Sequence, residues 1–224
     1  GMHMGYHDSR RFPDFAVVGP PNELTGVIDC VVITHFHLDH CGALPHLTET
    51  LGYRGPIFMT APTMAIASIL LKDYAHIMSE RRGSACYKPS AVDACMRRVT
   101  PVTLGETIVV DELLALKTHY AGHVLGAVIV SARCRGQSVV YTGDFNATAD
   151  RHLGCAHPLG VLLGDQLGVG AETLLFGEQL AEQNLVGHCA VRRRLPRRCE
   201  HLHEHGDGRV WRLLALGELA RQRP

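Results

Sequence analysis

The segment HFHLDH at residues 35–40 constrains this chain more than any other feature, because it places four potential metal ligands within six positions. It closes residues 27–35, a mostly apolar and β-branched run that is typical of a buried strand. A turn after such a strand can direct alternate side chains toward one point, where imidazoles and a carboxylate suit Zn²⁺. A histidine-rich surface loop is the competing interpretation, since the chain holds 15 histidines, but it explains this spacing less well.

The spacing within the segment predicts two half-sites for metal ions. His35 and His37 would bind one ion, and Asp39 and His40 would bind a second. A short helix is expected to begin near Asp39 and to run into residues 42–47. Each half-site still needs ligands from elsewhere in the chain, because zinc sites in proteins use three or four protein ligands.

His123 and Asp144 are the candidates that would complete these shells. His123 lies in AGHVLGA at 121–127, between two β-rich runs, and the nearby glycines allow a sharp backbone turn. Asp144 directly follows SVVYTG, another strand-like run. Each residue alone is more often an ordinary loop histidine or turn aspartate, but both share the layout of a ligand at the end of a strand. We therefore expect one joint site, with Asp144 as the carboxylate that bridges two ions.

A pair of metal ions predicts hydrolysis by an activated water molecule, without a nucleophilic side chain. Within the metal-binding set, we assign catalytic roles to Asp39 and Asp144. The sequence holds no G-x-S-x-G, phosphate-binding loop or dinucleotide motif, so competing catalytic schemes lack support. Weaker candidates for a supporting role, each with an ordinary structural residue as the alternative, are Cys41, His46, His119 and His152.

Strand and helix patterns alternate first and strands dominate later, which predicts a layered α/β domain over residues 1–154. An apolar pattern of helical period begins at Thr63, the expected N-cap, and a second helix is expected over 91–99. From about residue 107 the chain is rich in strand-forming runs, with a hairpin turn expected at 135–137.

Residues 155–224 differ in texture, being rich in glycine and leucine first and in arginine later. We expect a divergent, weakly ordered tail here, and short helices around 171–186 and 210–222 are the alternative. The arginine cluster at 192–198 could contact RNA phosphate, although a solvated basic run explains it equally well.

The overall charge is balanced, with 22 basic and 22 acidic residues, so only a local site could attract RNA. The eight cysteines form no C-x-x-C pair, no apolar stretch is long enough to span a bilayer, and the start of the chain does not resemble a signal peptide. These features predict free thiols in a reducing compartment, the cytosol or the nucleus, and no membrane partner.

Several longer segments resemble the β-CASP branch of the metallo-β-lactamase superfamily over about residues 1–154: HFHLDHCGALP, GPIFMTAPT, LLKDY, YAGHVLGA, YTGDFN and DRHLG. Within that branch, GMHMG, RRFPDF and GYRGPI are most similar to the Integrator-type endonucleases. The resemblance implies a metallo-β-lactamase-like αββα sandwich, of which this chain would hold an incomplete, N-terminal portion. It also implies a zinc-dependent RNA endonuclease of a nuclear RNA 3′-end processing assembly, with RNA and other Integrator-like subunits as partners.

The resemblance further implies a ligand set. His35, His37 and His123 would hold the first zinc ion, Asp39 and His40 the second, and Asp144 would bridge them. The inserted β-CASP domain and the later histidines that close the second zinc shell have no counterpart here, so that shell is expected to be one ligand short. We therefore expect weak or absent activity for the isolated chain. The alternatives are a non-catalytic metal-binding fragment and a small-molecule thioester hydrolase of the same superfamily.

Overall fold

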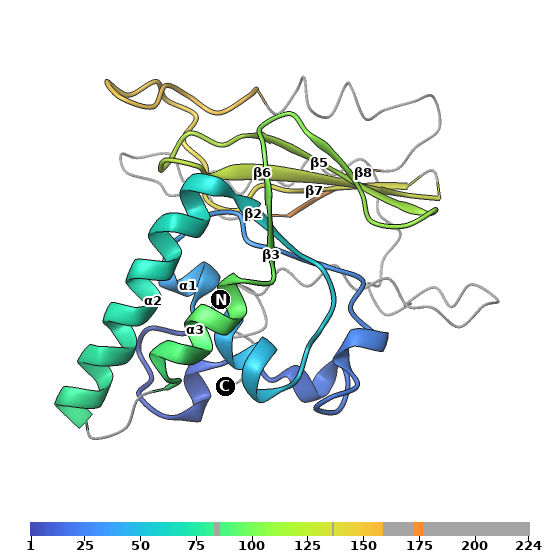
Figure 1. Ribbon diagram of the computed structural model, residues 1–224. Coiled ribbons are helices and arrows are strands. Elements are labelled where there is room, and N and C mark those ends of the chain that lie inside the picture. Colours follow the sequence, from blue (N-terminus) through green and yellow to red (C-terminus); the bar gives the residue numbers. More distant parts are fainter. Residues whose placement is uncertain (83–85, 136, 159–172, 177–224) are drawn as a thin grey trace, which may run out of the picture.

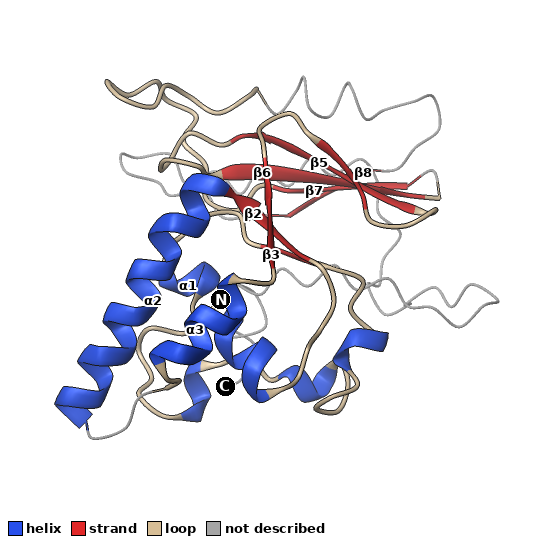
Figure 2. Ribbon diagram, viewed as in Figure 1, coloured by secondary structure: helices blue, strands red, loops and turns tan. Residues whose placement is uncertain are grey.

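The computed structural model describes residues 1–82, 86–135, 137–158 and 173–176, and the fold below refers to these ranges. Two β-sheets lie face to face, and the helices gather on the far side of the smaller sheet (Figure 1, Figure 2). This arrangement confirms the predicted α/β class, in which each sheet buries one face against another layer.

The smaller sheet has the order β1-β2-β3, and its strands are parallel throughout. Its strands are Val31–Val32 (β1), Ile57–Thr60 (β2) and Val99–Val102 (β3). Ile57 in the central strand aligns with Val31 on one side and with Val99 on the other. Because parallel strands are joined by crossovers, the helices fall between them in sequence and cover one face of the sheet.

The helices that cover this sheet are α1 (Leu38–Cys41), α2 (Ala61–Arg82) and α3 (Pro89–Met96), with shorter turns at Ser9–Arg11, Phe15–Val17, Leu24–Gly26 and His46–Thr50. The prediction that Thr63 caps α2 is wrong, because the helix already begins at Ala61. Thr60 takes the capping role, since its hydroxyl oxygen accepts the backbone N–H of Thr63 at 3.4 Å. The helix predicted over 91–99 lies slightly earlier, with Pro89 in its first turn.

The larger sheet has the order β4-β5-β6-β7-β8. Its strands are Thr107–Val109 (β4), Leu114–Tyr120 (β5), Val128–Cys134 (β6), Gln137–Tyr141 (β7) and Thr173–Phe176 (β8). The first four are antiparallel, and the predicted hairpin is confirmed by the pairing of Cys134 with Gln137. Arg135 in that turn has a φ of 48°, which suits a tight hairpin connection.

The core lies in three layers around the sheets. The largest cluster joins the helices to the smaller sheet and contains the fully buried Leu24, Leu47 and Tyr53. A second cluster fills the space between the sheets, where Phe58 of β2 meets Leu116 and Val130. β6 is buried on both faces, because Val128 and Val130 point to this space while Ile129 packs into a third cluster. A strand buried on both faces is held firmly, and the site described below lies at its N-terminal end.

Residues 155–224 fall largely outside the described ranges, including the arginine cluster at 192–198 and the segment 210–222. The described residues 173–176 form β8, which pairs in parallel with β7 and aligns Ser138 with Thr173. Neither the expected weakly ordered tail nor the alternative, a short helix around 171–186, includes this strand. The physical reason is tertiary, because the edge of β7 offers backbone groups that a short apolar run can pair with. No helix among the described residues is long and apolar enough to cross a bilayer.

Candidate metal centre

His35 and His37 are positioned by the end of the smaller sheet. The backbone carbonyl of Thr34 accepts the N–H of Val128 at 3.0 Å, which ties this end of the segment to β6. His35 follows directly and is completely buried. His37 has an extended backbone and stands at the start of α1, and its carbonyl accepts the N–H of His40 at 2.9 Å. The turn therefore fixes both histidines before the helix carries Asp39 and His40 around to the same side.

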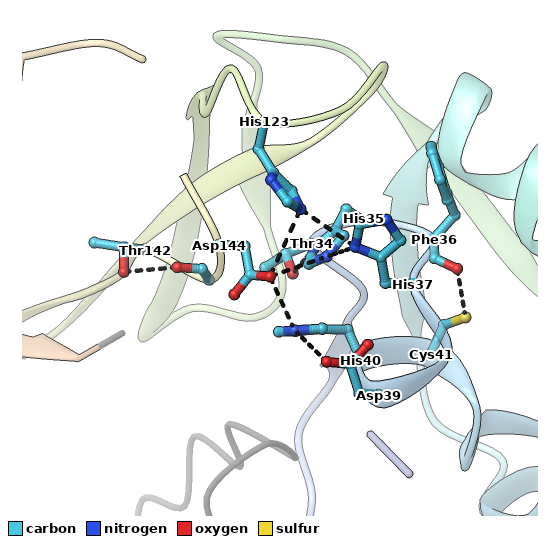
Figure 3. Close-up of polar contacts among 11 residues, drawn as sticks. Thr34, His35, Phe36, His37, Asp39, His40, Cys41, His123, Thr142 and Asp144 are labelled. Atoms are coloured by element: carbon cyan, nitrogen blue, oxygen red, sulfur yellow. Dashed lines mark hydrogen bonds and ion pairs between the residues drawn. The ribbon is translucent and has the colours of Figure 1, made fainter. Parts of the chain in front are cut away.

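His123 reaches the same point from the loop between β5 and β6. Its φ is 53°, a left-handed conformation that costs a residue other than glycine about 1–3 kcal/mol. The preceding Gly122 has a φ of 65° and packs closely, since an added Cβ would lie 3.0 Å from the backbone oxygen of Asn146. This tight turn explains why a glycine precedes His123, and it points the His123 ring at His37 (Figure 3).

Asp144 comes from the end of β7. The preceding Gly143 has a φ of 53°, and an added Cβ there would lie 3.0 Å from the Thr34 hydroxyl oxygen. Glycine at 143 therefore lets the segment that carries Asp144 approach the segment that carries His35. Asp144 itself is only 7% exposed.

Four side chains converge so that one ligand atom from each lies within 4.8 Å of all the others: His35, His37, His123 and Asp144. Nδ1 of His37 is 3.1 Å from Nε2 of His35 and 3.2 Å from Nε2 of His123. One carboxylate oxygen of Asp144 is 3.7 Å from the His35 nitrogen and 3.6 Å from the His123 nitrogen. Figure 3 shows these groups pointing toward one another.

These separations fit the corners of a metal coordination shell. Ligand atoms around a tetrahedral zinc ion at ~2.0 Å are ~3.3 Å apart. The distances of 3.1 to 3.7 Å lie around this value for nitrogen and oxygen pairs alike. Three imidazoles and one carboxylate are also the donor types that zinc accepts. The residues present therefore fit a metal ion at this point.

Asp39 and His40 lie beside this group and are joined to it through Asp144. Nε2 of His40 is 3.5 Å from a carboxylate oxygen of Asp144 and 3.5 Å from a carboxylate oxygen of Asp39. The Asp39 side chain is 58% exposed, so it faces solvent on the open side of the cluster. All six residues named from the sequence thus form one contact network, in which four make the compact group and two flank it.

Thr34 contributes to the site although the sequence did not single it out. Its buried hydroxyl lies 3.2 Å from Nδ1 of His35. If that ring nitrogen donates its proton to the hydroxyl, the lone pair of Nε2 faces the other ligand atoms, as metal binding requires. Its position directly before the first histidine was the one available signal.

The weaker candidates have structural surroundings. The buried Cys41 thiol donates to the Phe36 carbonyl at 3.2 Å, and burial raises its pKa to about 12. The ring of His46 stacks on Phe12 with centroids 4.1 Å apart. Nε2 of His119 is 2.8 Å from the hydroxyl of Ser131, and the exposed His152 donates its backbone N–H to Asp150. None of these four side chains belongs to the compact ligand group.

Burial sets the electrostatics of the cluster. It lowers the pKa of the His35 imidazole well below the ordinary value, and the neighbouring His40 lowers it further. Burial also lowers the pKa of His123. Burial alone would raise the pKa of Asp144, but its contact with His40 and the imidazoles of His35 and His123 bring it below the ordinary value. These pKa shifts favour neutral imidazoles at His35 and His123 and an ionised carboxylate at Asp144, the forms that bind metal.

The metal-free chain is expected to lose stability as the pH falls below about 6.5. The folded state keeps His35 neutral there while the unfolded state binds the proton, so the free energy of unfolding rises with pH across this window. Thermal melts of the chelated chain between about pH 7 and pH 5.5 would measure the effect, before most carboxylates titrate. His35→Gln tests the source of the effect, because it removes this imidazole and should reduce the slope. A melting temperature that stays flat over this interval would contradict the prediction.

The layered sheets and the His/Asp group together define an α/β protein with a candidate metal centre. The chain belongs to the metallo-beta-lactamase superfamily, because the family model described as the metallo-beta-lactamase superfamily domain matches residues 8–167. That match continues past residue 154, the domain boundary expected from the sequence.

Curated relatives share the same part of the chain. This chain is 57% identical over 157 residues to an Integrator complex subunit 11 homolog from Dictyostelium discoideum, and the match covers 70% of this chain and 21% of the relative. It is 52% identical to Integrator complex subunit 11 from Danio rerio and 47% identical to cleavage and polyadenylation specificity factor subunit 3-II from Arabidopsis thaliana. Each of these two matches covers 70% of this chain and 26% of the relative. The chain therefore spans about a quarter of the length of these proteins.

Proposed function

We propose that this chain is the metal-binding portion of a zinc-dependent RNA endonuclease that acts in RNA 3′-end processing. The convergence of His35, His37, His123 and Asp144 is the observation that carries the proposal. The identity of 57% to an Integrator subunit homolog directs it toward RNA rather than toward another substrate of the superfamily. RNA, other Integrator-like or 3′-end processing subunits and a nuclear location belong to the same proposal.

The six candidate ligands would divide between two zinc ions. His35, His37, His123 and Asp144 would hold the first zinc ion, and Asp39, His40 and Asp144 would hold the second. Bound zinc would supply Lewis-acid activation of water and of the phosphate, the chemistry that a phosphodiester hydrolase needs. Asp144 contacts His40 as well as His35 and His123, which supports the proposal that it would bridge the two ions. The carboxylate of Asp39 is exposed and would accept a proton on the solvent side.

The second ion would be held more weakly than the first. Asp39, His40 and Asp144 provide three protein ligands, whereas among the described residues the four-ligand set whose ligand atoms all lie within 4.8 Å of one another is His35, His37, His123 and Asp144. This difference favours, as a second candidate, a metal-binding portion with no activity of its own. It also explains why we expect little hydrolysis from the isolated chain.

Metal content and cleavage assays on the purified 224-residue chain test the proposal. We expect the chain to bind zinc, with one tight equivalent and a weaker second one, measured by plasma mass spectrometry after gel filtration. A single-stranded RNA and a thioester are then offered to the zinc-loaded chain. RNA cleavage above a chelated control supports the endonuclease, zinc binding without turnover supports the non-catalytic candidate, and thioester turnover alone would rule out the endonuclease.

A further inference from the structure

The loop that carries His123 is held in an unfavourable backbone conformation. Gly122, His123 and Gly126 all have positive φ, at 65°, 53° and 82°. Glycine adopts such values readily, but histidine does so only where its surroundings fix it. The loop closes on itself through a hydrogen bond from the N–H of Ala127 to the carbonyl of Val124 at 3.0 Å. This bond leaves the carbonyl of Gly126 pointing away from the loop.

Two threonine hydroxyls bind that carbonyl. The hydroxyl oxygens of Thr60 and Thr63 are 2.7 and 3.1 Å from the Gly126 oxygen and 2.9 Å from each other. Both threonines are buried, with exposed fractions of 3% and 0%. The packing is tight as well, since a Cβ added at Gly126 would lie 2.7 Å from the Thr60 hydroxyl. We call these three residues the threonine clamp.

The two threonine hydroxyls of the clamp each donate one hydrogen bond, and more than one arrangement of donors and acceptors is possible. If Thr60 donates to Gly126, then Thr63 can donate to Thr60 or to the same carbonyl. If Thr60 instead donates to Thr63, then Thr63 donates to Gly126. In each arrangement the Gly126 carbonyl accepts at least one hydrogen bond, so either hydroxyl can partly replace the other. Removal of both would leave a carbonyl that the loop closure does not satisfy.

The clamp connects the His123 loop to the elements that carry the other ligands. Thr60 ends β2 and Thr63 lies in the first turn of α2, which begins beside the two sheets (Figure 1). β2 pairs with β1, the strand that leads to His35. The position of His123 relative to His35 and His37 therefore depends on hydrogen bonds between residues that lie 63 and 66 positions apart in the sequence.

We propose that Thr60 and Thr63 are positioning residues for His123, which hold its loop in the conformation that aims the ring at His37 and Asp144. This inference rests on the proposed zinc site. The two threonines touch no ligand atom and act through the Gly126 carbonyl. Their removal is expected to reduce zinc affinity by about 10–100-fold, the usual range for groups that orient ligands.

Zinc affinity and the visible spectrum of the Co²⁺-substituted chain test this role. We expect Thr60→Val and Thr63→Val each to weaken zinc binding by a few fold, and the double valine variant to weaken it by about 10–100-fold, more than the product of the single effects. The double valine variant should also lose the intense absorption of tetrahedral Co²⁺. The double serine variant keeps both hydroxyls and should bind and absorb like the original chain.

Thr118→Val is the matched control. Thr118 is equally buried and its hydroxyl donates to the Thr103 carbonyl at 2.7 Å, so this variant loses the same type of bond away from the His123 loop. It should reduce thermal stability without changing zinc affinity or the Co²⁺ spectrum.

The outcomes separate the two proposals. If the original chain binds zinc and the folded double valine variant binds it equally well, the threonine clamp has no positioning role and the zinc site stands. If the original chain binds no zinc, the zinc site itself is wrong and this inference falls with it. If the double valine variant does not fold, the single variants decide, and unchanged affinity in both overturns the inference.

Discussion

Replacement of His37 by alanine is expected to abolish tight metal binding. Its Nδ1 lies 3.1 Å from the His35 nitrogen and 3.2 Å from the His123 nitrogen, so it joins the two other imidazoles of the group. Loss of a direct ligand should reduce zinc affinity by more than the ~100-fold that loss of an orienting group can cause. Zinc per chain, measured after gel filtration in micromolar free metal, should fall from at least one equivalent to near zero.

The control for this variant is His76→Ala. His76 is exposed and pairs with Glu80 on α2, so its removal deletes an imidazole without touching the cluster. Its zinc content should match that of the original chain. If His37→Ala retained its zinc and any hydrolytic activity unchanged, the ligand assignment for the whole 35–40 segment would be wrong.

Substitutions at Asp144 and Asp39 are expected to differ in the number of ions lost. Asp144 contacts His35, His40 and His123, so Asp144→Asn removes the charge that both ions would share and should weaken both. Asp39 contacts His40 alone among these imidazoles, so Asp39→Asn should remove the second, weaker equivalent and leave about one. Isothermal titration with zinc would resolve the two steps.

The matched control is Asp93→Asn, which removes an exposed carboxylate that pairs with Lys72 at 2.6 Å. Both zinc binding steps should persist in this variant. Equal loss of a single equivalent in Asp144→Asn and Asp39→Asn would contradict a bridging role for Asp144, because the two carboxylates would then serve the same ion.

The α/β class could be predicted from the sequence because it depends on local patterns. Apolar runs such as 27–35 mark buried strands, and the helical period after β2 marks α2. Boundaries were less accessible, as the N-cap at Thr60 rather than Thr63 shows. β8 was not predicted, because a run of four residues is too short to indicate a strand by itself and its pairing with β7 is a tertiary contact.

The candidate site divides in the same way. The residue types were visible in the sequence, since ligand-type side chains directly follow strand-like runs at 35–40, at His123 and at Asp144. The spacing and the family resemblance already indicated how these residues divide between two ions, but the actual convergence of the three segments was not visible. It depends on distances between segments that are remote in the chain, and the metal-binding role of all six stays a prediction until metal is measured.

The sequence by itself determined which side chains are available and that each stands at the end of a strand, because strand pattern and ligand chemistry are properties of short segments. Only the tertiary structure decided that Gly143 admits Asp144 beside Thr34 and that Thr60 and Thr63 fasten the loop of His123. The physical reason is that close approach and carbonyl capping are made by non-local contacts, and no single segment encodes its partner's position.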